Sequence, residues 1–133
     1  MAKTYNIFIS HSWDHVNDLM NLRRLLENRG YFKVEFFEVP PHDPIESTNS
    51  NYIKSVIKHK IAQSDVVIGI AGIYASYSEW MKWELNTAKS MGKPVLGVIP
   101  WNQQRVSQIV DQISDKIVRW NTESIVEAIR QMA

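Results

Sequence analysis

Two short segments of the sequence are apolar almost without interruption. Residues 64–71 read SDVVIGIA, and residues 94–99 read PVLGVI. A strand with one face in water shows a polar residue at every second position, whereas a parallel strand covered by helices on both faces is apolar throughout. These two segments therefore predict central strands of an α/β protein whose sheet lies between two layers of helices.

The rest of the chain alternates between strand and helix patterns. Strands are expected at residues 5–10, 32–39 and 116–119, and helices from Asp14 to a stop at Gly30 and at residues 51–62, 76–90, 106–113 and 122–131. Charged residues alternate along 32–39, which places that strand nearer the sheet edge. Strands that alternate with helices form parallel sheets with right-handed connections. The pattern predicts one domain over residues 1–133: a three-layer, doubly wound, five-stranded parallel sheet in the flavodoxin-like order 2-1-3-4-5.

The composition argues against several classes of protein. The 133 residues carry a formal net charge of +1, so no strong field recruits nucleic acid or an anionic membrane. The absence of cysteine excludes disulfides and thiolate zinc sites and suits a reducing compartment. The N-terminus has no signal-peptide pattern, and no stretch approaches the ~20 apolar residues of a membrane span. A cytoplasmic location is therefore expected.

The segment SEWMKWEL, residues 78–85, places an acid beside a tryptophan on one helix face. Trp80 and Glu84 are four residues apart, and Glu84 borders the expected core stripe of Met81, Leu85 and Ala88. Two interpretations stay open. Glu84 is either a surface acid paired with Lys82 or Lys89, or a carboxylate held against aromatic surface, where it can stabilise a developing cation during glycoside cleavage.

A second acid, Glu79, has a structural explanation. It stands three residues after Ser76 at the start of the same helix, which is the spacing of a capping box. Glu79 is therefore expected to cap the start of this helix, and Glu84 is the better candidate for a catalytic residue.

Polar and aromatic side chains are expected where the strands end. Sheets of this kind bind ligands at the carboxyl ends of the strands, beside the switch point between strands 1 and 3. Candidates to contact a ligand there are Ser10, His11 and Ser12 after the first strand and Tyr74, Tyr77, Trp80 and Trp83 around the third helix. His11 and His15 have metal-ligand spacing, but no third ligand follows, so no metal site is expected.

Three segments together resemble TIR domains. They are YNIFISHSWD, SDVVIGIAG and SEWMKWELNTAKSMGKPVLGVI, in that order along the chain. The resemblance is strongest to the prokaryotic branch that includes the small TIR proteins of the Thoeris antiphage system. It implies an NAD glycohydrolase or cyclase, with NAD as substrate and no cofactor. Glu84 would be the catalytic residue, Ser10, His11 and Ser12 would lie near the ribose or phosphates, and Tyr77 and Trp80 would shape the pocket.

The resemblance also implies partners. The product would be an ADP-ribose-derived signal that activates a separately encoded effector, and a viral trigger would start the reaction. Self-assembly would use the proline-rich segment 39–50, which contains His42 and Asp43 and follows the second strand.

Two other functions fit the same pattern. A TIR-like module that only recruits partners would not need Glu84, and a nucleoside deoxyribosyltransferase also uses a glutamate on a doubly wound sheet. A phosphoacceptor receiver domain is set aside, because residues 10–12 read SHS where that fold needs an acidic cluster.

Assembly through the proline-rich segment can be tested with a double substitution. Replacing His42 and Asp43 together with Ala should lower activity without lowering the melting temperature, since both are expected in an exposed loop. Activity per subunit should also rise with protein concentration, because the site would be completed by a neighbour in a propagating contact. Activity that is independent of concentration and survives the double substitution would show that one subunit holds the whole site.

Overall fold

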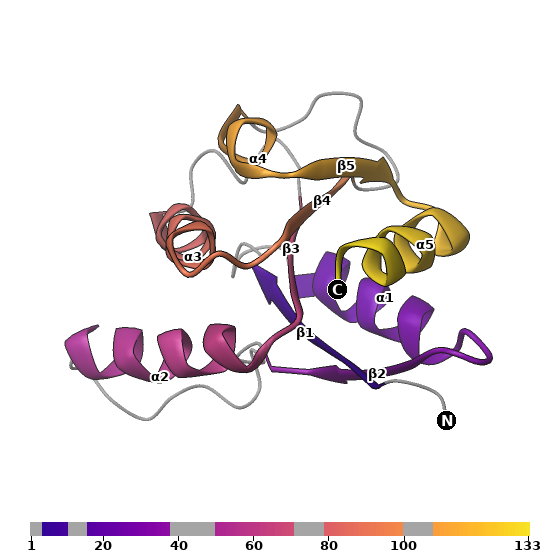
Figure 1. Ribbon diagram of the computed structural model, residues 1–133, viewed down its shortest axis with the longest axis horizontal. Helices are drawn as coiled ribbons and strands as arrows, with labels where there is room; N and C mark the ends of the chain where they lie inside the picture. The colour runs from indigo at the N-terminus through magenta and orange to yellow at the C-terminus, as the bar shows by residue number, and fades with distance from the viewer. Residues whose placement is uncertain (1–3, 11–15, 38–49, 71–78, 100–107) are drawn as a thin grey trace.

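The five strands form one parallel sheet in the order β2-β1-β3-β4-β5, as the sequence predicts (Figure 1). The computed structural model describes residues 4–10, 16–37, 50–70, 79–99 and 108–133. The strands are β1 (Thr4–Ser10), β2 (Lys33–Phe36), β3 (Val66–Ile70), β4 (Val95–Ile99) and β5 (Lys116–Arg119). The helices are α1 (Val16–Glu27), α2 (Ser50–Gln63), α3 (Glu79–Ser90), α4 (Gln108–Ile113) and α5 (Thr122–Met132).

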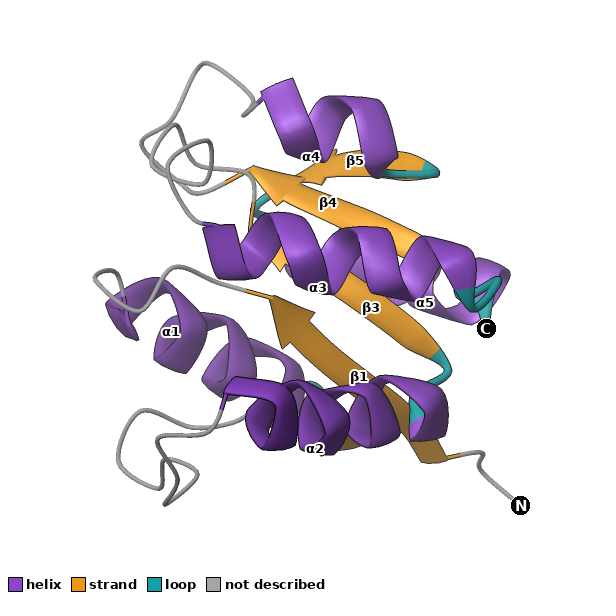
Figure 2. Cartoon of the chain, turned by 90° about the vertical axis from the view of Figure 1, so that its left-hand side faces the viewer, coloured by secondary structure: helices purple, strands orange, loops and turns teal. Residues whose placement is uncertain are grey.

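The sheet lies between two layers of helices. Helices α1 and α5 cover one face, and α2, α3 and α4 cover the other, which faces the viewer in Figure 2. Every residue of β3 and β4 is buried, which confirms the interpretation of the two apolar segments, and β2 is an edge strand, as expected. Along β1, Ile7 and Ile9 pack toward α1 and α5, whereas Phe8 packs on the opposite face. Strand alternation therefore turns the Ser10 side chain toward α3.

Two aspartates set the register between neighbouring strands. Just before β3, Asp65 accepts a hydrogen bond from the Asn6 backbone N–H at 2.9 Å and donates its own N–H to the Asn6 carbonyl at 2.7 Å. Just before β5, Asp115 makes the same pair of bonds with Val95, at 2.9 and 2.8 Å. Asp65 thus links the start of β3 to β1, and Asp115 links the start of β5 to β4.

Helix α3 ends as its sequence predicts, but α1 does not. Gly92 has a φ of 74°, and the bonds from Gly92 N–H to Lys89 and from Lys93 N–H to Ala88 form a Schellman motif. Helix α1 ends at Glu27, and the left-handed residue after it is Tyr31, with a φ of 59°, so the expected stop at Gly30 is wrong.

The left-handed Tyr31 is held by its surroundings. Its carbonyl accepts a bond from Arg130 of α5 at 2.9 Å. The next residue, Phe32, is buried, and its ring stacks on Tyr5 with the ring centroids 5.3 Å apart. These contacts with α5 and β1 hold the chain at Tyr31, which takes the left-handed conformation although Gly30 precedes it. A smaller expectation also fails: β2 ends at Phe36, before the expected end of the strand at residue 39.

Gly97 is needed for the close packing of α4 on the sheet. A Cβ placed there would lie 2.9 Å from Val110 and 2.8 Å from the Ser114 hydroxyl. Gly97→Ala should therefore destabilise the protein by ~1–3 kcal/mol, as overpacking does. Gly30→Ala is the matched control, because a Cβ there has open space and φ is not positive. Urea unfolding of both variants checks the difference, and equal stabilities would contradict it.

Candidate active site

A buried hydrogen bond joins β1 to α3. The Ser10 hydroxyl donates to Glu84 Oε1 at 2.8 Å, between residues 74 positions apart in the chain. Ser10 is the last residue of β1, so the pair lies at the carboxyl end of the strand, beside β3. This is the switch point at which doubly wound sheets bind their ligands.

Glu84 is buried, which excludes one of its two interpretations. Its relative exposure is 9%, and that of Ser10 is 0%. Lys89 forms its ion pair with Asp115 instead. The interpretation of Glu84 as a surface acid paired with lysine is therefore wrong.

The expected core stripe of α3 places Glu84 against the sheet. Met81, Leu85 and Ala88 are all fully buried, as the spacing predicts. Gly69 pairs with Ser10 in the sheet, and Leu85 packs over it, 3.3 Å from where a Cβ would stand. With Leu85 seated over the glycine, the preceding residue in the helix, Glu84, reaches the end of β1.

Burial raises the pKa of Glu84 from its ordinary value of 4.5 to about 8, and the Ser10 hydrogen bond acts in the opposite direction. Desolvation disfavours the charged form of a carboxyl group, whereas a donor stabilises it. At neutral pH the unliganded carboxyl is therefore mostly protonated. A positive charge brought beside it would favour the ionised form.

Comparison with known families shows which family the chain belongs to. Residues 8–105 match the family model described as "Thoeris protein ThsB, TIR-like domain". The chain belongs to this family. The matched range contains both Ser10 and Glu84, so the buried pair lies inside the TIR-like part of the sequence. No curated protein sequence matches the chain significantly.

Solved structures share the fold at low sequence identity. The CMP N-glycosidase BcmB of Clostridium botulinum is similar at a TM-score of 0.57 and 13% identity, over 94% of this chain and 98% of that chain. A protein described as pilus assembly-related from Burkholderia pseudomallei is similar at a TM-score of 0.58 and 13% identity, over 96% of this chain and 88% of that chain. These similarities show the α/β fold of the TIR-like chain.

Most of the other expected site residues are not placed by the structure. Glu79 and Trp80 belong to the first turn of α3, but their side chains are not among those described. Outside the described residues altogether lie His11, Ser12, Asp14, His15, His42, Asp43, Tyr74, Ser76 and Tyr77. Of the expected ligand-contacting residues, the structure thus brings only Ser10 to Glu84, and the roles of the others stay predictions.

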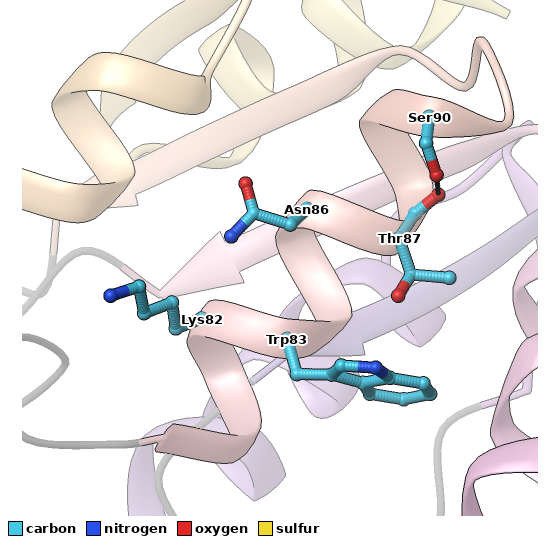
Figure 3. A pocket seen from close by; sticks show the side chains of 5 residues that line it. All are labelled: Lys82, Trp83, Asn86, Thr87 and Ser90. Carbon is cyan, nitrogen blue, oxygen red and sulfur yellow. Dashed lines mark hydrogen bonds between the residues drawn. The ribbon is translucent and has the colours of Figure 1, made fainter.

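A separate hollow of about 490 Å³ lies on the outer side of α3 (Figure 3). Lys82, Trp83, Asn86, Thr87 and Ser90 line it. The Lys54 ammonium of α2 lies over the Trp83 ring, 5.5 Å from its centroid. Trp83 therefore takes part in the contact between α2 and α3, and its expected contact with a ligand stays a prediction.

Two searches of the described residues give negative results. No group of three or more His, Asp or Glu side chains in them is placed to hold a metal ion. None of the helices in this part of the chain is long and apolar enough to cross a membrane.

Glu84→Gln should stabilise the TIR-like chain more strongly as pH rises. Between pH 4.5 and about 8 the unfolded chain loses the Glu84 proton while the folded chain keeps it, so the wild type loses stability across this window. A shift of this size corresponds to at most ~5 kcal/mol. Urea unfolding at several pH values should show the advantage of the variant growing up to about pH 8 and then levelling.

The exposed acid Glu127 provides the matched control. Glu127→Gln should change stability little at any pH, since its side chain lies at the surface of α5. Parallel pH profiles for the wild type and Glu84→Gln would contradict the burial of a protonated Glu84.

Proposed function

We propose that this TIR-like chain cleaves NAD and that Glu84 is the catalytic carboxylate. The observation that carries the proposal is the buried Ser10–Glu84 pair at the carboxyl end of β1, within a chain of the Thoeris TIR-like family. A buried carboxyl group with a strongly shifted pKa is a candidate active-site residue. Glu84 is such a group, with its pKa raised to about 8.

The reaction needs only one carboxylate because its leaving group is good. The bond between ribose C1′ and the nicotinamide nitrogen breaks, and the electron pair leaves with nicotinamide, which becomes neutral. Positive charge develops on the ribose as an oxocarbenium ion, and ionised Glu84 stabilises it electrostatically. Water then adds to C1′ and loses a proton to give ADP-ribose. Attack by a nitrogen of the same molecule would instead give a cyclic product.

The positive charge of NAD would act on a Glu84 carboxyl group that is protonated in the free protein. The nicotinamide ring of NAD is a pyridinium cation, so a bound substrate would bring a positive charge to a carboxyl group that is protonated in the free protein. An opposite charge within ~4–6 Å lowers the pKa of a carboxyl group. Substrate binding would therefore ionise Glu84 at the moment when the negative charge is needed.

A neutral nucleotide is the alternative substrate. BcmB shares the fold and is named a CMP N-glycosidase, an activity directed at the same type of bond. A neutral base would bring no positive charge to Glu84. The carboxyl group would then stay protonated at neutral pH and could act only as a general acid on the leaving base, whereas NAD needs the ionised form. Incubation with NAD and with CMP therefore separates the two substrates.

The family suggests the biological setting of the reaction. We propose that the product is an ADP-ribose-derived signal in antiphage defence, made in the cytoplasm after a viral trigger and passed to a separately encoded effector. The support for this setting is membership in the Thoeris TIR-like family.

Glu84→Gln should abolish NAD cleavage while the fold stays intact. The substitution keeps the volume of the side chain and removes the charge that stabilises the transition state. Loss of a preorganised electrostatic group typically costs ~10²–10³-fold in rate. Mass spectrometry of nucleotides after incubation with NAD, with and without phage-infected extract, measures the effect, and CMP serves as the neutral comparison substrate.

Glu79→Gln is the matched control, five residues away in the same helix. It should cost little activity and at most a fraction of the ~1 kcal/mol typical of a cap. If Glu79 is essential and Glu84 dispensable, the assignment is wrong. If NAD stays intact under every trigger, the chain is an interaction module or acts on another substrate.

Binding of NAD should be linked to pH through Glu84. Affinity for carba-NAD, which keeps the pyridinium charge and resists cleavage, should rise with pH up to about 8 and then level, because binding releases the Glu84 proton. NADH, whose dihydronicotinamide ring is uncharged, should show no such slope. Calorimetric titrations in two buffers of different ionisation enthalpy count the released protons, and Glu84→Gln should release none.

A further inference from the structure

We propose that Ser10 is a positioning residue, whose hydroxyl fixes one oxygen of the Glu84 carboxyl group and does not contact the substrate. The inference rests on the proposed function, since it assigns Ser10 a role in the site of that reaction. It replaces the expectation from the sequence that Ser10 is a substrate ligand.

Accessibility separates the two members of the pair. Ser10 has no exposed surface, whereas Glu84 retains a relative exposure of 9%. A serine hydroxyl has one proton to donate, and that proton is already directed to Glu84 Oε1 at 2.8 Å. A ribose hydroxyl or phosphate approaching from solvent would therefore meet Glu84, with Ser10 behind it.

The geometry holds Glu84 in one orientation. Ser10 belongs to β1, which is paired on both sides, with β2 and with β3. Helix α3 is anchored on the sheet by Leu85, which packs over Gly69 next to Ser10. Because both backbones are fixed, the hydrogen bond immobilises Oε1 and leaves Oε2 for the reacting ribose. Such preorganisation is what makes a charged group effective in a transition state.

No other described side chain takes over this role. Among the described side chains, the charged or imidazole groups on the helices packed around Glu84 are Lys54, Lys58, His59 and Lys60 of α2, Lys82 and Lys89 of α3 and Asp111 of α4. Lys54 lies over the Trp83 ring, and Lys89 pairs with Asp115. The pKa of Glu84 is governed by burial, which raises it, and by Ser10, which lowers it.

The test compares Ser10→Ala with Ser10→Thr, which keeps the hydroxyl. The Glu84 carboxyl carbon is titrated directly by NMR on protein labelled with ¹³C at glutamate side-chain carboxyls, with Glu84→Gln to assign the signal. Loss of the donor should raise the titration midpoint by about one unit, since the hydrogen bond stabilises the charged form of the carboxyl group. Ser10→Thr should restore the wild-type midpoint. If the added methyl group prevents folding, Ser10→Cys, a weaker donor, should give an intermediate midpoint.

Kinetics with NAD give the second readout. Ser10→Ala should lower kcat/KM at neutral pH by roughly tenfold, the equivalent of a one-unit shift in the pKa of the free carboxyl group, and the loss should shrink as pH rises. KM above pH 9 should stay within about twofold, because no substrate contact is removed. A large rise in KM with an unmoved titration midpoint would overturn the inference and make Ser10 a substrate ligand.

The two proposals fail separately. If the wild type does not cleave NAD but Ser10→Ala still shifts the Glu84 titration, the proposed function is wrong and the coupling stands. If NAD is cleaved and the titration midpoint does not move, only the positioning role of Ser10 is wrong.

Discussion

The candidate active site depends on one buried carboxyl group, that of Glu84, which lies between the sheet and α3. Burying an acid costs free energy, and the described residues compensate Glu84 with one neutral donor, Ser10, and with no ion pair. The Glu84 carboxyl group therefore stays protonated in the folded chain at neutral pH, and the free energy of unfolding falls as pH rises. A cost of this kind is typical of functional sites, where local strain or desolvation is retained because chemistry needs it.

The arrangement of the sheet makes this burial possible. Three small residues, Ser10, Gly69 and Gly97, stand side by side across β1, β3 and β4. On the α3 and α4 side, the space left by the two glycines is filled by Leu85 and Val110. The helices thus pack close enough to the sheet for a short serine side chain to reach a glutamate. The fold supplies the position, but it does not determine the function, since proteins of different descriptions share it at 13% identity.

The sequence predicts the elements of this fold well because their signals are local. Uninterrupted apolar segments identify β3 and β4, helical spacing identifies the buried stripe of α3, and Gly92 marks where α3 ends. Non-local contacts are what it misses. The left-handed turn falls on Tyr31 instead of Gly30 because Arg130 bonds the Tyr31 carbonyl from another element. Glu84 could be recognised as unusual, but its bond to Ser10, 74 residues away, leaves no periodic trace in the sequence.

The central claim is that a cationic substrate ionises a buried, protonated Glu84. Infrared difference spectroscopy of the protein at neutral pH, before and after addition of carba-NAD, tests it most directly, with Glu84→Gln to assign the bands. The account predicts that binding removes the band of a protonated carboxyl group and produces a carboxylate band, and that both changes are absent in Glu84→Gln. An unchanged carboxyl band in the presence of saturating carba-NAD, or a carboxylate already present in the free protein, would contradict it.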